Sequence, residues 1–406
     1  MAVGLRVPSA LLPVRGVRLA ACSAGIYRRP RPDLSLIAVP PGSTGAALFT
    51  TNAFCAAPVS VARSHLSAAS PRYCLINAGN ANAGTGARGL SAASETCRAL
   101  AEVGGCSPEE VLPFSTGVIG EHLPVEPIRK AIPGLHAGLG EDGWMDCAHA
   151  IMTTDTVPKG SSRTVEIDDR SVTITGIAKG AGMIHPDLAT MLVFVATDAV
   201  IEAGALQAML ARVGAYSFNC ITVDGDTSTN DAVVLLATGQ SGHPVLRSGD
   251  EPRAVGFQAA LGEVCTELAQ AIVRDGEGAT KFISVCAEEG ADANECMAVA
   301  RAVAGSPLVK TAFFASDPNW GRILAAVGRA GIRDLDISRV SLLLDEVCVV
   351  EEGQRAPAYT EQDGQRVMSR SEITIRIRLG RGSAAATVWT CDLSHEYVRI
   401  NAEYRS

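Results

Sequence analysis

The stretch I-A-K-G-A-G-M-I-H-P-D-L-A-T-M-L-V-F-V, residues 177–195, decides the fold. A flexible turn containing two glycines leads into Ala189-Thr190, and an almost wholly apolar run, Met191–Ala196, follows the threonine. A short uninterrupted apolar run of this kind is typical of a strand buried on both faces. The hydroxyl of Thr190 is therefore expected at the mouth of a hydrophobic core, which is an unusual place for a polar group.

Two interpretations of Thr190 compete. In the plainer one, Thr190 caps the strand and its hydroxyl bonds a nearby carbonyl. In the other, Thr190 is a nucleophile released by cleavage of the Ala189-Thr190 bond, because a freed α-amine on the same residue can act as the base that a threonine hydroxyl needs. The small alanine leaves that bond accessible, and the upstream glycines let the chain bend. The residue types and their spacing leave both interpretations open.

The stretch K-G-A-G-M-I-H-P-D-L-A-T-M-L closely resembles the self-processing signature of the ornithine acetyltransferases of arginine biosynthesis, also called glutamate N-acetyltransferases. The resemblance extends along nearly the whole chain, in one order. The other blocks that carry it are T-T-N (50–52), N-A-G-N-A-N-A-G-T-G (77–86), S-T-G-V-I-G (115–120), I-M-T-T-D-T (151–156), I-T-V-D-G-D-T-S-T-N-D (221–231), A-I-V-R-D-G-E-G-A-T-K-F (271–282), S-D-P-N-W-G-R (316–322) and the terminal N-A-E-Y-R-S (401–406).

The resemblance implies a layered αββα sandwich of the self-processing, N-terminal-nucleophile kind, with a smaller C-terminal α+β domain. Self-cleavage would give an α chain of residues 1–189 and a β chain of residues 190–406. Within the β chain, residues 190–283 would complete the sandwich and residues 284–406 would form the smaller domain. The family also implies an α2β2 assembly of these chains.

The same resemblance implies a reaction and its residues. Thr190 would take acetyl from N2-acetyl-L-ornithine and pass it to L-glutamate, without a cofactor, and acetyl-CoA is a further conceivable donor. The oxyanion hole would be Thr116 and Gly117, which also suit the role by type, since a hydroxyl and an unhindered N–H side by side can bind a developing oxyanion. The substrate-binding residues implied are Thr153, Lys179, Thr190, Glu277, Asn401 and Ser406, the last standing where the family often has threonine.

Composition excludes several other functions. The formal net charge is −8, which argues against nucleic acid or an anionic membrane as a partner. No apolar segment reaches the length of a bilayer span. The 12 cysteines include no C-x-x-C pair, and the seven histidines show no metal-ligand spacing, so we expect reduced thiols, no bound metal and a cytoplasmic protein. Leu19–Cys22 resembles a lipoprotein cleavage box, but arginines and prolines interrupt the apolar region that a signal peptide needs.

Two loops invite other ligands. Gly84, Gly86 and Gly89 form G-x-G-x-x-G between an expected strand, Tyr73–Asn77, and an expected helix, 90–103. The first glycine lies too far beyond that strand for a dinucleotide turn, so a tight structural loop is favoured. The acidic loop D-G-D-T-S-T-N-D lacks the glutamate that completes a calcium-binding EF-hand loop, and we interpret it as structural or site-lining.

The remaining pattern alternates strands and helices. The clearest helix is expected over Arg253–Arg274, where Phe257, Leu261, Val264, Leu268 and Ile272 form one apolar stripe that ends just before Glu277. The other elements expected from residue patterns are strands at 34–39, 46–49, 111–114, 164–167, 172–177, 220–223 and 232–237, helices at 142–152 and 203–213, and alternating helices and strands from about 284 onward.

Rival functions remain open at this level. A self-processing N-terminal-threonine amidohydrolase or aminopeptidase would share the fold and the nucleophile, because neither specifies water or an amine as acceptor. A nucleotide-binding oxidoreductase would use the glycines of residues 84–89. A scaffold without catalysis would not need the Thr190 hydroxyl at all. The match of blocks far from Thr190 favours acetyl transfer.

Overall fold

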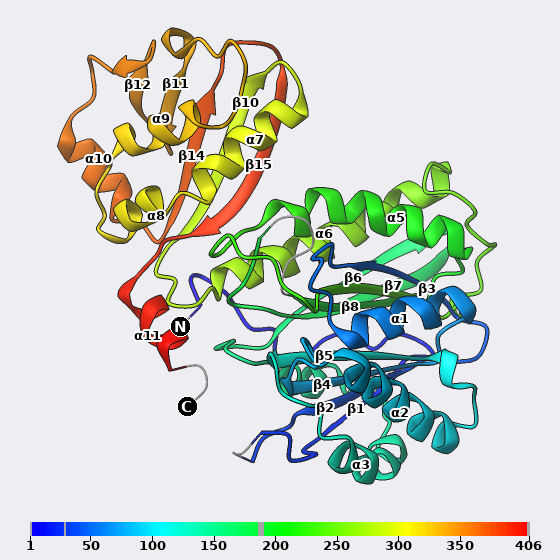
Figure 1. The fold of residues 1–406 in the computed structure, drawn as a ribbon. Helices are drawn as coiled ribbons and strands as arrows, with labels where there is room; N and C mark the ends of the chain where they lie inside the picture. The colour runs from blue at the N-terminus through cyan, green and yellow to red at the C-terminus, as the bar shows by residue number, and fades with distance from the viewer. Residues whose placement is uncertain (1, 28–29, 186–190, 404–406) are drawn as a thin grey trace. The chain divides into compact units, whose positions relative to one another are not determined.

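The computed structural model describes residues 2–27, 30–185 and 191–403 of the 406-residue chain. The chain divides into two compact units, whose elements are labelled in Figure 1. The larger unit holds Val7–Asn219 and Asp226–Ile272. The smaller unit holds Met1–Arg6, Cys220–Gly225 and Val273–Ser406.

The larger unit contains two sheets. The four-stranded sheet has the order β1 (Arg18–Cys22), β2 (Leu34–Ala38), β4 (Tyr73–Asn80), β5 (Val111–Val118), and only β4 and β5 are parallel. The five-stranded sheet has the order β3 (Thr44–Phe49), β9 (Ala232–Ala237), β8 (Leu192–Thr197), β7 (Arg170–Lys179), β6 (Lys159–Ile167), and only β8 and β9 are parallel.

Helices cover the outer faces of these sheets. Figure 1 shows α2 (Gly86–Gly104) and α3 (Val125–Ala137) against the four-stranded sheet, with α5 (Ala203–Tyr216) and α6 (Val255–Arg274) over the five-stranded sheet. The shorter helices α1 (Ala57–Ala68) and α4 (Trp144–Ala150) complete the unit. The predicted αββα layering is therefore confirmed.

The core of the larger unit lies between the two sheets. Every residue of β8 and of β9 is buried, as the apolar run after Thr190 predicts. Phe114 of β5 meets Phe194 of β8 edge to face, with ring centroids 5.1 Å apart, and such a pair contributes about 0.5 to 1.5 kcal/mol beyond the area that it buries. The strand that follows the candidate nucleophile is thus anchored in the centre of the sandwich.

The smaller unit is an α+β structure, as predicted. Its sheet has the order β13 (Gln354–Arg355), β12 (Val347–Glu351), β11 (Ser341–Leu344), β14 (Glu372–Arg378), β10 (Phe282–Gly290), β15 (Ala384–Cys391). Its core joins one face of this sheet to α7 (Ala293–Ala304), α8 (Pro307–Phe314) and α9 (Trp320–Gly328). The last two helices are α10 (Glu361–Met368) and α11 (His395–Ala402).

Residues 220–223 do not form the predicted strand. Phe218–Cys220 is a 3₁₀ turn, and Ile221 makes only an isolated bridge to Trp389 of β15. The apolar side chains of this run are buried within the smaller unit, to which the run belongs. Their burial, and not pairing in a sheet, explains the apolar pattern. The main segment of the smaller unit begins at Val273, and two short segments from earlier in the chain join it. The division into chains of residues 1–189 and 190–406 stays a prediction.

All 12 cysteines are free thiols. Within the part of the chain that the structure describes, no helix has the length and apolar character needed to cross a membrane.

Candidate active site

The predicted oxyanion residues lie at a bulge where β4 and β5 end. Gly79 of β4 pairs with Gly117 of β5, and the register shifts at the next residue, where Asn80 faces both Thr116 and Val118. Gly117 has φ +133°, and a Cβ there would lie 2.3 Å from the carbonyl carbon of Gly79. Only glycine fits this conformation.

The Thr116 side chain faces the space between the sheets. It is buried and lies two residues beyond Phe114, and side chains two apart point to the same face of a strand. The hydroxyl of Thr116 and the amide of Gly117 are therefore adjacent donors on a rigid strand end, at the rim of the core.

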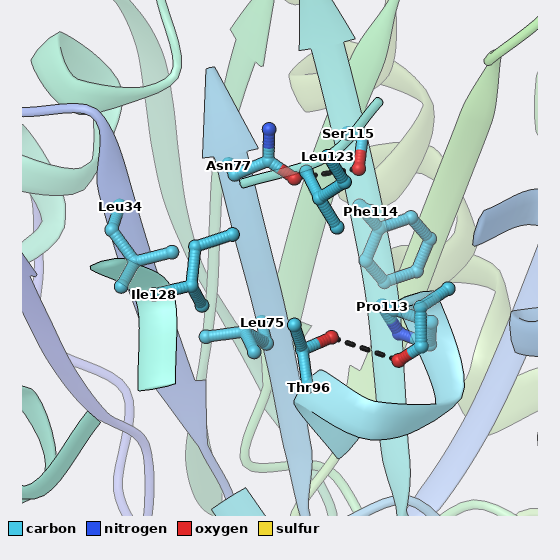
Figure 2. A pocket seen from close by; sticks show the side chains of 10 residues that line it. Leu34, Leu75, Asn77, Thr96, Pro113, Phe114, Ser115, Leu123 and Ile128 are labelled. Carbon is cyan, nitrogen blue, oxygen red and sulfur yellow. Dashed lines mark hydrogen bonds between the residues drawn. The ribbon is translucent and has the colours of Figure 1, made fainter. Parts of the chain in front are cut away.

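Asparagine side chains hold this strand end in place. Asn77 Oδ1 accepts a hydrogen bond from Ser115 Oγ at 2.6 Å, and Figure 2 shows the two side chains pointing toward each other from neighbouring strands. The cavity that they line, of about 10 Å³, is near the minimum for one water molecule and far too small for an amino acid. The hydrogen bond between Asn77 and Ser115 therefore ties β4 to β5 on the outer face of this strand end.

Asn230 links the two sheets at the same end of the sandwich. It precedes β9 of the five-stranded sheet, and its Nδ2 donates to Ser115 O of β5 at 2.9 Å and to Ala81 O at 2.7 Å. The oxyanion strand and the start of β9 are thereby fixed to each other.

The ends of β7 and β8 come together beside this link. Lys179, the last residue of β7, pairs with Leu192, the first residue of β8, and Lys179 is buried. The carboxylate of Asp231 accepts the Met191 N–H at 2.7 Å. Burial raises the pKa of Asp231 well above its ordinary value, although the Met191 amide and the charge of Lys179 oppose the rise. Ala189 and Thr190 lie outside the described residues.

Thr153 lies on a neighbouring loop that a buried aspartate ties to the end of β7. Asp155 Oδ2 accepts the Thr153 N–H at 2.9 Å, and Asp155 Oδ1 accepts the Gly180 N–H at 2.7 Å. Of the predicted site residues, the structure thus brings Thr116, Gly117, Lys179 and Thr153 to the larger unit.

Two predicted substrate residues meet in the smaller unit. Asn401 of α11 donates from Nδ2 to Glu277 Oε2 at 2.6 Å, and Glu277 is buried. Asn401 belongs to helix α11. Ser406 lies outside the described residues.

Thr116, Gly117 and Lys179 give the larger unit two neighbouring hydrogen-bond donors and a buried lysine. Among the described residues, no three His, Cys, Asp or Glu side chains are grouped to hold a metal ion. The segment of residues 84–89, a loop that runs into the first turn of α2, is filled by its own side chains, because Asn82 Nδ2 donates to Gly89 O and a Cβ on Gly89 would lie 1.9 Å from Thr85 Oγ1. That loop has the tight conformation that the sequence favours.

Comparison with known proteins decides the family. The model of the ArgJ family matches residues 18–406. The chain belongs to the ArgJ family.

One relative of this ArgJ-family chain matches it almost end to end, and two solved structures match about half of it. It is 59% identical over 396 residues to the arginine biosynthesis bifunctional protein ArgJ of Methylococcus capsulatus, covering 98% of this chain and 97% of the relative. The crystal structure of the arginine biosynthesis bifunctional protein ArgJ from Bacillus halodurans is 38% identical, with a TM-score of 0.50, over 52% of this chain and 97% of the solved one. Ornithine acetyltransferase from Mycobacterium tuberculosis, solved with ornithine, is 32% identical over 45% and 96%, with a TM-score of 0.39.

Sequence reasoning missed three residues of this ArgJ-family site. Asp155, Asn230 and Asp231 all stand in the blocks that carry the family resemblance, but their role depends on partners that only the fold brings close. The available signal was a carboxylate or amide within a polar block, and the sequence does not say which backbone groups it bonds.

Proposed function

We propose that the chain transfers acetyl from N2-acetyl-L-ornithine to L-glutamate through an acetyl ester on Thr190, after cutting itself at Ala189-Thr190. The observation that carries the proposal is the end-to-end match, at 59% identity, to a bifunctional ArgJ protein of arginine biosynthesis. An acyltransferase in arginine biosynthesis follows from membership of that family.

The first stage is self-cleavage. Thr190 Oγ attacks the Ala189 carbonyl carbon and loses its proton, the C–N bond breaks, and the nitrogen takes up a proton, which leaves an ester. Water then opens the ester to give the Ala189 carboxylate, the Thr190 hydroxyl and a free α-amine on Thr190.

The second stage reuses the same oxygen. The freed α-amine takes the Thr190 Oγ proton as that oxygen attacks the acetyl carbonyl of N2-acetylornithine. Ornithine leaves with that proton on its nitrogen, and acetyl stays on Thr190. The amine of glutamate then attacks the ester, and Thr190 regains its hydroxyl. No group is oxidised or reduced in these steps, and no cofactor is required.

Thr116 and Gly117 are proposed to stabilise the oxyanion of both acyl steps. Their donors are preorganised, since the bulge, the positive φ of Gly117 and the asparagine links fix the strand end before substrate arrives. One such donor is worth about 2.7 to 4 kcal/mol in the transition state.

Substrate recognition is proposed to rest on groups that both amino acids share. Lys179 suits an α-carboxylate, and Thr153 adds a polar contact in the same unit. Glu277, Asn401 and Ser406 are proposed to contact the rest of the substrate, as the family resemblance implies. The name of the Methylococcus relative, a bifunctional protein, supports acetyl-CoA as a second acetyl donor to glutamate in this chain.

Intact-mass measurement and an acceptor assay test the proposal together. We expect two fragments that break at Ala189-Thr190, one uncut chain for Thr190→Ala, and acetylglutamate formed from N2-acetylornithine only by the cut protein. Acetate release that exceeds acetylglutamate formation at saturating glutamate would instead identify an amidohydrolase. An active Thr190→Ala variant would refute the mechanism.

A further inference from the structure

Asp155 is a buried carboxylate that no step above uses. Its side chain is fully buried, as is the side chain of its ion-pair partner Lys159, and Lys159 Nζ lies 2.6 Å from Asp155 Oδ1. The same carboxylate accepts the Thr153 N–H and the Gly180 N–H. Three separate parts of the chain thus meet on one side chain: the loop after α4, the start of β6 and the turn after β7.

We infer that Asp155 is a positioning residue that fixes Thr153 and the Lys179-Gly180 turn in the geometry that binds substrate. The inference rests on the proposed function, which gives Thr153 and Lys179 their substrate contacts. It adds a residue that itself need not touch the substrate.

The turn after Lys179 shows why a positioning group is needed there. Lys179 ends β7 and is held by the ladder on one side, through its pairing with Leu192. Gly180 lies beyond the last pair of the β7–β8 ladder and has φ +153°, a conformation that residues with side chains rarely adopt. The hydrogen bond from the Gly180 N–H to Asp155 fixes the other side of the lysine.

The charge of Asp155 suits this role. Burial alone would raise the pKa of Asp155, but Lys159 and Lys179 outweigh it, and the pKa lies well below the ordinary value for an aspartate. The group therefore stays an acceptor at neutral pH, and it offsets part of the positive charge that two lysines bring into the core. A buried ion pair is weak support for stability by itself, since apolar residues of similar size often replace one without loss.

Four variants separate positioning from simple stabilisation. Asp155→Asn keeps the size of the side chain but replaces one acceptor oxygen by an NH2 group, which then faces the N–H donors that the carboxylate now accepts. Asp155→Asn with Lys159→Met removes both charges, so that no unpaired lysine stays buried. Lys159→Met alone completes the cycle. Asp198→Asn is the matched control, because Asp198 is equally buried, pairs with Arg15 and accepts the Thr173 N–H at 2.8 Å, away from the proposed site residues.

The readouts are the melting temperature and the KM and kcat for each substrate. We expect Asp155→Asn to raise the KM of both N2-acetylornithine and glutamate by about tenfold or more, the effect of losing a charge-assisted hydrogen bond, with a smaller change in kcat. The double variant should recover melting temperature but not KM. Asp198→Asn should lower the melting temperature and leave both KM values unchanged. Recovery of KM together with stability in the double variant would overturn the inference.

Hydrogen exchange separates this inference from the proposed function. The amides of Thr153 and Gly180 should exchange faster in Asp155→Asn and in the double variant than in the parent, and those of Asp198→Asn should not. Unchanged exchange at both amides refutes a positioning role whatever the activity. A parent protein that shows no acetyl transfer refutes the proposed function, and exchange then still decides whether Asp155 holds the two segments.

Discussion

Gly117 shows how one residue type can set a catalytic geometry. No other residue fits its φ and its contact with Gly79, so the neighbouring threonine is presented at a strand end whose shape is fixed by the backbone. Sequence alone identifies Thr116 and Gly117 as a donor pair, because hydroxyl and glycine stand side by side. It does not reveal the bulge, which depends on pairing with a strand some 40 residues earlier.

At this scale the first prediction concerns Thr116. Thr116→Ala should lower kcat for acetyl transfer by about 10² to 10³, with little change in KM, because the hydroxyl is needed where charge develops. Steady-state kinetics measure the effect. Thr116→Ser keeps the hydroxyl and should retain most of kcat. Equal losses in the two variants would show that the methyl group, and not the donor, matters.

The second residue-scale prediction concerns Asp231. Its pKa is raised in the folded protein, so the folded state holds a proton that the unfolded state releases near pH 4. The stabilising contribution of that proton is present at low pH and is lost as the pH rises through the folded pKa. Asn does not ionise, so Asp231→Asn does not lose stability in this way. The melting temperature of the variant, relative to that of the parent, should therefore increase as the pH rises above 4.

The control for this pH series is Asp226→Asn, which removes an exposed carboxylate from the same loop. Melting temperatures of the three proteins, measured at several pH values on the uncut Thr190→Ala background, check the prediction. A constant difference between Asp231→Asn and the parent would contradict it.

Elements with strong apolar patterns were predicted well. The runs of β2, β8 and β9 are buried over their whole length, and α6 covers the predicted stripe of five apolar residues. The strand predicted at 220–223 was wrong because burial against a neighbouring segment gives the same pattern as a ladder. Helices such as α1 and α3 were not predicted, since alanine, proline and glycine blur their periodicity. The site was predictable where resemblance named a residue, and not where hydrogen bonds across the fold define it.

At the scale of the element, β8 should be the most sensitive strand. Phe194→Ala removes one ring of the edge-to-face pair and leaves a cavity between the sheets, at a cost of about 3 to 5 kcal/mol. Denaturant unfolding of the Thr190→Ala protein measures the change. Phe54→Ala, which truncates a ring that is 56% exposed, should cost far less. A similar cost at both positions would show that the ring pair contributes little.

The whole molecule is interleaved across the proposed cleavage point. In the five-stranded sheet, β8 and β9 come from residues after 190, whereas β3, β7 and β6 come from residues before it. Strands β9 and β8 are therefore flanked by β3 on one side and β7 on the other. The smaller unit likewise contains Met1–Arg6, where the Val3 N–H donates to Arg274 O at 2.7 Å.

At this scale we predict that the two fragments stay together after cleavage. The ladders between β3 and β9 and between β7 and β8 do not involve the broken bond. Native size-exclusion chromatography should give one peak that contains both fragments, and strong denaturant should separate them. The Thr190→Ala chain is the control for the size of the uncut protein. A free fragment under native conditions would contradict the interleaved sheet.

Because the sheet is interleaved, recovery of the structure after heating should depend on whether the chain has been cut. Before the cut, the strands are linked and meet again at a concentration set by the connecting chain; afterwards, two separate polypeptides have to find each other, and the rate depends on dilution. On cooling, the uncut Thr190→Ala protein should regain its structure at any dilution, while the cut protein should regain less of it the more it is diluted. The lifetime of the cut protein at high temperature is then set by its unfolding rate more than by its free energy of unfolding.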